Sequence, residues 1–277
     1  MQLLRDQGDP VRVVIGEDAA DAESRAGEAV TSGARGLVVV GGDGAANVGL
    51  NVAAREKVPF GVIPAGSGND FARALDMGGL AVGPAVSAIT TAENTGARRI
   101  DLGQLASGRY FGCVLSTGFD AAVNARANRM RGPGGRARYP AAMLAELGAF
   151  KAIDLTVSID GVTHQHRAML VAVGNGPSYG GGMRICPAAS LDDGRFNITV
   201  VDEMSVPELL WLFPRVYRGT HVTHPKATTY VGERVSVTGS DGPLHAPVFA
   251  DGEAVTSGLL SAQVVPDALQ VLGPCLP

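Results

Sequence analysis

Two glycine-rich stretches have the residue types and the spacing of a phosphate-binding site. Each follows a short apolar run, at residues 37–40 and 60–63, and each leads into a segment with helical periodicity. Glycine lets the backbone turn sharply beside a phosphate, and the N–H groups of a first helical turn point toward an anion. The candidate phosphate ligands are Gly41, Gly42, Asp43, Gly44, Gly66, Ser67, Gly68, Asn69 and Asp70. Two such loops on successive βα units predict a shared polyphosphate site at the carboxyl ends of parallel strands. We also expect Gly66 to need a positive φ.

Several carboxylates could act on a ligand bound at this phosphate site. Asp43 is the one charged residue of the first loop, and it could lie at the phosphates or simply cap a helix. Asp251 follows the apolar run 248–250, so we expect it at a strand end as the general base, with Glu253 supporting it or a metal. The alternative is that Asp251 only forms an Asp-Gly hairpin turn. Asp192 and Asp193 could bind a cation through oxygen, or could form a solvated acidic loop.

The order of the expected elements places these loops in an α/β fold with two domains. Strands at 11–15, 37–40 and 60–63 alternate with helices, which predicts a doubly wound parallel sheet that binds a nucleotide. After residue 97 short strands dominate, which predicts a β-rich, antiparallel, sandwich-like domain. We therefore divide the chain into residues 1–97 with a returning segment at about 267–277, and residues 98–266.

Within the second domain, Asp160-Gly161 between two apolar runs predicts a β-hairpin turn. We expect one strand at 228–238, a helix at 139–149, and another at 205–218 that starts near Pro207.

The motifs resemble the catalytic domain of the diacylglycerol kinase family, which also includes sphingosine and ceramide kinases. The resemblance rests on Gly41–Gly44, Pro64–Arg73, Asn175–Met183 and Leu191–Phe196, followed by Asp251-Gly252-Glu253. It implies an ATP-dependent lipid kinase that transfers the γ-phosphate to a primary lipid hydroxyl, most simply that of diacylglycerol, with Mg²⁺ as cofactor. It also implies a base role for Asp251, a nucleotide-site position for Asp43, and a structural Mg²⁺ near Asp192 and Asp193.

Three departures from the family pattern keep other interpretations open. Ala45 replaces a threonine, Val48 replaces a frequent glutamate, and no Asn-Pro-x-x-Gly loop precedes the first expected strand. We expect that the true chain starts further upstream. A non-catalytic lipid-binding or regulatory relative is one alternative. An NAD kinase, which also uses Gly-Gly-Asp-Gly, is another, although it is not expected to carry the second glycine block.

The amino-acid composition narrows the classes of binding partner that we expect. The chain has 277 residues with 23 basic and 27 acidic side chains, which argues against nucleic-acid binding. Its three cysteines fit free thiols in a reducing cytoplasm, and no apolar run approaches the roughly 20 residues of a membrane span. We expect a cytoplasmic protein that contacts the membrane surface transiently; its oligomeric state is open. Five arginines in a glycine-rich stretch could touch anionic headgroups or could form a solvated loop: Arg126, Arg129, Arg131, Arg136 and Arg138.

Overall fold

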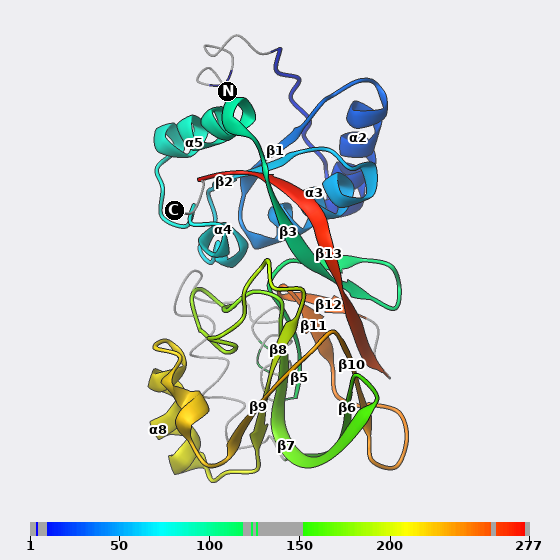
Figure 1. The fold of residues 1–277 in the computed structure, drawn as a ribbon, viewed down its shortest axis with the longest axis vertical. Coiled ribbons are helices and arrows are strands. Elements are labelled where there is room, and N and C mark those ends of the chain that lie inside the picture. Colours follow the sequence, from blue (N-terminus) through cyan, green and yellow to red (C-terminus); the bar gives the residue numbers. More distant parts are fainter. Residues whose placement is uncertain are drawn as a thin grey trace.

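Parallel strands flanked by helices form one half of the structure, and antiparallel strands form the other (Figure 1). The computed structural model describes residues 4, 10–118, 123, 126, 152–255 and 259–274. The predicted helix at 139–149 and most of the arginine-rich stretch lie outside the described residues.

The first half alternates helices and strands as the sequence predicts. Its elements are α2 (Ala19–Thr31), β1 (Leu37–Gly41), α3 (Asp43–Glu56), β2 (Phe60–Pro64), α4 (Asp70–Ala74) and α5 (Val82–Thr95). Strands β1 and β2 pair in parallel, so their carboxyl ends lie side by side. Helices cover both faces of β2, because Phe60 packs toward Gly49 of α3 while the next position, Gly61, faces Ile89 of α5. This is the doubly wound arrangement.

The predicted strand at 11–15 is wrong. Residues 10–16 carry no strand pairing, and the Ile15 side chain is 76% exposed. A strand requires a neighbour that satisfies its N–H and C=O groups. Within the described residues, β1 pairs only with β2 and stands at the edge of the sheet.

The second half is built mainly from antiparallel strands, of which β7 and β13 are long, with 13 residues each. Its elements are β3 (Arg98–Leu105), β4 (Tyr110–Phe111), β5 (Val114–Gly118), β6 (Ile153–Ile159), β7 (Val162–Gly174), β8 (Phe196–Asp202), α8 (Val206–Val216), η2 (Thr220–Thr223), β9 (Ala227–Gly232), β10 (Arg234–Gly239), β11 (Val248–Ala250), β12 (Glu253–Val255) and β13 (Leu260–Leu272). The main path of the sheet runs β1-β2-β13-β10-β6-β7-β5-β11-β12. Strand β13 joins the halves, because it pairs with β10 near its start and in parallel with β2 at its end (Figure 1).

The region expected as one strand at 228–238 is two strands. Strand β9 pairs with β8, whereas β10 pairs with β6 and β13. The chain changes partner at Glu233, whose backbone N–H donates to the carboxylate of Asp160 in the β6–β7 turn. That turn is the predicted Asp-Gly hairpin, with φ of 48° at Asp160 and 86° at Gly161.

Two hydrophobic clusters form the core of the described residues. One packs α3, α4 and α5 onto β2 and the end of β13, and it continues into the second half at residues such as Leu170 and Leu212. The other fills the antiparallel half, where the rings of Phe111 and Phe196 stack with centroids 5.8 Å apart. Within the described ranges no helix has the length and apolar character needed to cross a membrane.

Candidate active site

The two glycine loops touch each other at the carboxyl ends of β1 and β2. The backbone N–H of Ala65 donates to the carbonyl of Gly41 at 2.9 Å. A Cβ atom added to Gly66 would lie only 2.4 Å from the Cα of Gly42. Glycine is therefore required at residue 66 by this close approach of two backbones. The expected positive φ at Gly66 is wrong, because the φ of this residue lies outside the positive range.

The amino terminus of α3 is open toward this junction. The N-cap residue is Gly42, and no side chain caps the helix there. Gly44, in the first turn, is exposed. The first turn of a helix presents unpaired N–H groups and a partial positive charge of roughly half an elementary charge. This end of α3 therefore offers a phosphate the donors that the sequence predicts.

Asp43 ties the two loops together. Its carboxylate accepts hydrogen bonds from the backbone N–H groups of Asn69 at 2.8 Å, Asp70 at 2.6 Å and Phe71 at 3.4 Å. Asp43 therefore does cap a helix, as the alternative interpretation expects. The helix that it caps is α4, whereas Asp43 itself belongs to α3. The N–H groups that start α4 are already used by this carboxylate.

Asn69 closes the second loop on itself. This residue is left-handed, with φ of 55°. Its side-chain amide accepts from the N–H of Gly66 at 2.9 Å and donates to the carbonyl of Gly66 at 2.8 Å. Ser67 lies exposed at the tip of the same loop. The second loop is therefore held in shape by its own side chain.

Asp70 connects the nucleotide loop to the second half of the molecule. Its buried carboxylate accepts from the N–H groups of Gly181 at 2.6 Å and Gly182 at 2.8 Å, and it pairs with Arg73 at 3.0 Å. Burial raises the pKa of Asp70, and the nearby Asp43 carboxylate adds to the rise, against the lowering effect of its donors. The glycine stretch at 179–183 is thus fastened directly to α4.

Asp251 occupies the turn between β11 and β12, with φ of 49°. One carboxylate oxygen accepts from the N–H groups of Cys113 at 2.9 Å and Val114 at 3.1 Å. The other oxygen accepts from the N–H of Gly112 at 2.7 Å and from the Asn47 amide at 3.3 Å. Burial raises the pKa of Asp251, although the four donors oppose that rise. A carboxylate offers about four acceptor positions, so all of them have partners here.

Glu253 lies next to the open end of α3. A Cβ atom added to Gly44 would lie 3.4 Å from the Oε1 atom of Glu253. The Glu253 side chain is exposed, and in the described part of the chain it has no hydrogen-bond partner. The structure therefore brings Gly42, Gly44 and Glu253 to one place, with Asp43 and Asp251 held beside them.

The electrostatics of Cys113 show how closely the carboxylates gather. Burial raises the pKa of this thiol well above its usual value, and the charges of Asp251, Asp70 and Asp43 raise it further. Three aspartates from separate segments thus act on one buried residue between the two halves. The Cys113 thiol remains protonated and is a packing residue.

Polar residues of α3 that the sequence interpretation missed fix this geometry. Asn47 donates to Asp251 and accepts from Arg109 at 3.3 Å. One turn later, Asn51 bonds both the N–H and the carbonyl of Tyr110, at 2.8 and 3.0 Å. Both asparagines are buried. The sequence did contain a signal for these two residues, because a pair of amide side chains four residues apart on the buried face of a helix needs buried hydrogen-bond partners.

Asp192 and Asp193 lie in an exposed turn before β8. Asp192 accepts from the hydroxyl of Ser190, and Asp193 accepts from the N–H of Arg195 at 3.0 Å. No group of three acidic, histidine or cysteine side chains that could hold a metal occurs among the described residues. Cation binding by this pair stays a prediction.

Comparison with known proteins places the chain in a family. Residues 1–105 match the diacylglycerol kinase catalytic domain, and residues 113–273 match the YegS C-terminal NAD kinase beta sandwich-like domain. A diacylglycerol kinase of Mycobacterium tuberculosis is 38% identical over 279 residues, which cover 98% of this chain and 87% of that protein. The chain belongs to the diacylglycerol kinase family. It is therefore a lipid kinase.

Other relatives agree with this membership. A diacylglycerol kinase of Staphylococcus saprophyticus is 30% identical over 232 residues, covering 80% of this chain and 74% of that protein. The crystal structure of a diacylglycerol kinase from Bacillus anthracis superposes with a TM-score of 0.69 at 17% identity, covering 95% of this chain and 85% of the other. A second structure from that organism has a TM-score of 0.75 at 20% identity, covering 93% and 82%. These structures bear on the fold, and they support the two-part architecture predicted from the sequence.

Proposed function

We propose that this lipid kinase transfers the γ-phosphate of ATP to the primary hydroxyl of diacylglycerol and so forms phosphatidic acid. The observation that carries the proposal is the junction of the two glycine loops, where the uncapped end of α3 faces Glu253. A tight backbone cradle beside carboxylates is the arrangement that phosphoryl transfer requires. The family relatives named diacylglycerol kinase support diacylglycerol as the acceptor, in preference to NAD.

In this proposal α3 holds the phosphates, and the second loop forms the opposite wall. The unpaired N–H groups at the start of α3 bind phosphate oxygens, and Gly42 and Gly66 permit the close approach. Asp43 acts by fixing α4 and the second loop against the first. Asp70, at the start of α4, accepts from the N–H groups of Gly181 and Gly182 and so links α4 to the second half.

The acceptor hydroxyl needs a base, and we propose Asp251. Its raised pKa brings the carboxylate closer to the range in which proton transfer is efficient. Because four donors occupy its oxygens, one contact must be given up to the substrate. The Asn47 amide, at 3.3 Å, is the longest of the four and the natural one to exchange.

We propose that Mg²⁺ binds at the same place, with Glu253 as its one protein ligand among the described residues. Hard divalent cations prefer carboxylate oxygens, and Glu253 presents a carboxylate without a partner in the described part of the chain beside the start of α3. The ion would neutralise charge on the phosphates. Asp43 adds a second negative charge nearby, although its oxygens already accept three N–H groups.

The test compares Asp251→Asn with Asp160→Asn. Both aspartates occupy Asp-Gly turns with nearly equal φ, 49° and 48°, and both carboxylates accept backbone N–H groups. Asp160 lies in the exposed β6–β7 turn, so its variant controls for the change from Asp to Asn in an Asp-Gly turn, and the structural cost at the more buried Asp251 is measured by the folded fraction of each variant. We expect Asp251→Asn to lower turnover at least about a hundredfold, the contribution of a positioned base. Asp160→Asn should keep wild-type turnover per folded molecule.

Turnover is measured with γ-labelled ATP and diacylglycerol in mixed micelles, with Mg²⁺, and the folded fraction is read from circular dichroism. An NAD acceptor is run in parallel. Equal losses in both variants would remove Asp251 from the chemistry. Transfer of the label to NAD and not to the lipid would show that NAD is the acceptor. Lipid binding without any transfer of phosphate from ATP would favour a non-catalytic relative.

A further inference from the structure

Helix α8 carries large apolar side chains that are about half exposed along one side, and among the described residues their ring contacts are limited to the edges of that side, between Trp211 and His224 and between Tyr217 and Phe213. The buried side of the helix carries Leu212, with Leu209, Phe213 and Val216 packed partly against the core. The opposite side carries exposed residues at spacings of three and four: Pro207, Leu210, Trp211, Pro214 and Tyr217. Trp211 is 55% exposed and Leu210 is 44% exposed. Large aromatic and aliphatic side chains on one surface stripe mark an interaction site more often than a plain surface.

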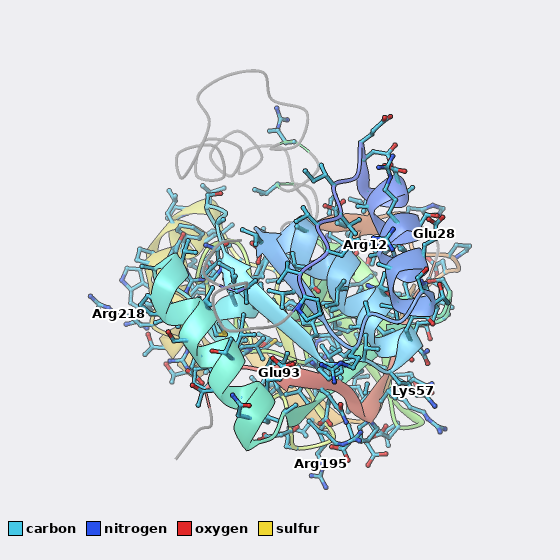
Figure 2. All side chains as sticks on the ribbon, turned by 90° about the horizontal axis from the view of Figure 1, so that it is seen from above. Arg12, Glu28, Lys57, Glu93, Arg195 and Arg218 are labelled. Carbon is cyan, nitrogen blue, oxygen red and sulfur yellow. The ribbon has the colours of Figure 1, made fainter. Side chains whose placement is uncertain are left out.

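The charge around this face is positive. The guanidinium of Arg215 stacks 3.7 Å from the centre of the Trp211 ring. Arg218 follows one turn later, and its side chain extends outward from the molecule (Figure 2). Neither arginine has an ion-pair partner among the described residues. The one acidic residue of the helix, Glu208, is already paired with Lys226 at 3.0 Å.

We propose that this face of α8 docks onto the surface of an anionic membrane. The proposal rests on the proposed function, because a kinase for diacylglycerol must reach an acceptor that resides in a bilayer. Tryptophan and tyrosine favour the headgroup region, where one end of the ring is apolar and the other is wet. Arginines at the same level meet anionic headgroups, and together these features describe a helix lying in the interface plane.

The size of the face favours a membrane over a folded protein partner. An 11-residue helix is about 16 Å long and presents a strip about 10 Å wide. A stable protein interface buries about 800 Å² on each partner, several times what this strip supplies. Reversible membrane binding does not require so large an area, because a few inserted apolar side chains with basic neighbours are sufficient.

Trp211 supplies the probe, because it is the single tryptophan of the chain. The intact protein is mixed with phosphatidylcholine vesicles with and without phosphatidylglycerol, in the absence of ATP and diacylglycerol. We expect the Trp211 emission to shift to the blue and to be quenched by brominated acyl chains, with stronger binding to the anionic vesicles.

Two variants and their matched controls test the residues. Leu210→Glu should lower the vesicle partition coefficient at least about tenfold, whereas Val162→Glu, at a 60% exposed position at the start of β7, should leave it unchanged. Arg218→Gln should lower it about fivefold, since one basic residue near the surface contributes about 1 kcal/mol. Arg12, exposed on another side of the molecule (Figure 2), is the matched charge control as Arg12→Gln.

A kinase assay separates this proposal from the proposed function. The ratio of turnover on vesicle-borne diacylglycerol to turnover on monomeric short-chain diacylglycerol should fall in Leu210→Glu and not in Val162→Glu. Vesicle binding without any kinase activity would overturn the proposed function alone. Unchanged Trp211 emission on adding anionic vesicles would overturn the docking surface. So would an emission shift that follows protein concentration without vesicles, because a second copy would then cover the face.

Discussion

The contact between Gly42 and Gly66 permits a graded test of the nucleotide cradle. A Cβ atom at residue 66 would lie 2.4 Å from the Cα of Gly42, and one at residue 42 would lie 3.1 Å from the Cα of Gly66. Carbon atoms in contact prefer a separation of about 3.5 Å. Gly66→Ala must therefore push the loops apart by about 1.1 Å, and Gly42→Ala by about 0.4 Å.

These displacements convert into expected losses of ATP affinity. An N–H donor at about 2.9 Å from a phosphate oxygen no longer bonds after moving away by about 1 Å. A hydrogen bond to a charged group contributes about 1.5–3 kcal/mol, so Gly66→Ala should weaken ATP binding at least about tenfold. Gly42→Ala should weaken it by no more than about threefold, because a shift of about 0.4 Å leaves the bonds in place.

The assay is calorimetric titration of each variant with ATP and Mg²⁺, at a temperature where circular dichroism shows the protein folded. Overpacking costs about 1–3 kcal/mol of stability, so thermal unfolding is recorded for every variant. Gly83→Ala in α5 is the control, because no atom lies within 4 Å of its added Cβ.

The expected order of ATP affinity is wild type equal to Gly83→Ala, then Gly42→Ala, then Gly66→Ala. Gly42→Ala keeps the test informative if Gly66→Ala does not fold. Wild-type affinity in folded Gly66→Ala would refute the idea that the paired loops form the phosphate cradle.

Two further outcomes concern the contacts that join the halves. Burial raises the pKa of Asp70 above its ordinary 3.8, so the stability that comes from the protonated carboxyl is complete below that pH and is lost as pH rises through the folded-state pKa. Urea unfolding should therefore show Asp70→Asn gaining stability relative to wild type as pH rises above about 4, and a pH-independent difference would contradict this. Asn51→Ala leaves the N–H and carbonyl of Tyr110 without their side-chain partner and should cost at least about 2 kcal/mol of unfolding free energy, whereas Asn94→Ala, at an exposed position of α5, should cost less than about 1 kcal/mol. Equal costs would argue against a role for Asn51 in joining α3 to β4.

Local pattern was enough to predict the framework of the site. Apolar runs at 37–40 and 60–63 became β1 and β2, and the glycine stretch after each became a loop that leads into a helix. These features depend on residues close in sequence, namely burial periodicity and the conformational freedom of glycine. The same reasoning failed at 11–15, where strand formation depends on a neighbouring strand.

The residue pattern was sufficient to identify the carboxylates and the glycine loops, whereas the contacts that each one makes depend on how the chain folds. Asp160 and Asp251 read alike, as Asp-Gly turns with left-handed backbones. Asp160 accepts from the N–H of Glu233 and so holds the start of β10 against the β6–β7 hairpin. Asp251 accepts from the N–H of Gly112, which is 139 residues away in sequence. Asp43 likewise caps a helix that starts 27 residues later. Hydrogen bonds between distant segments form only after the sheet has brought them together, and residue spacing along the chain carries no record of that pairing.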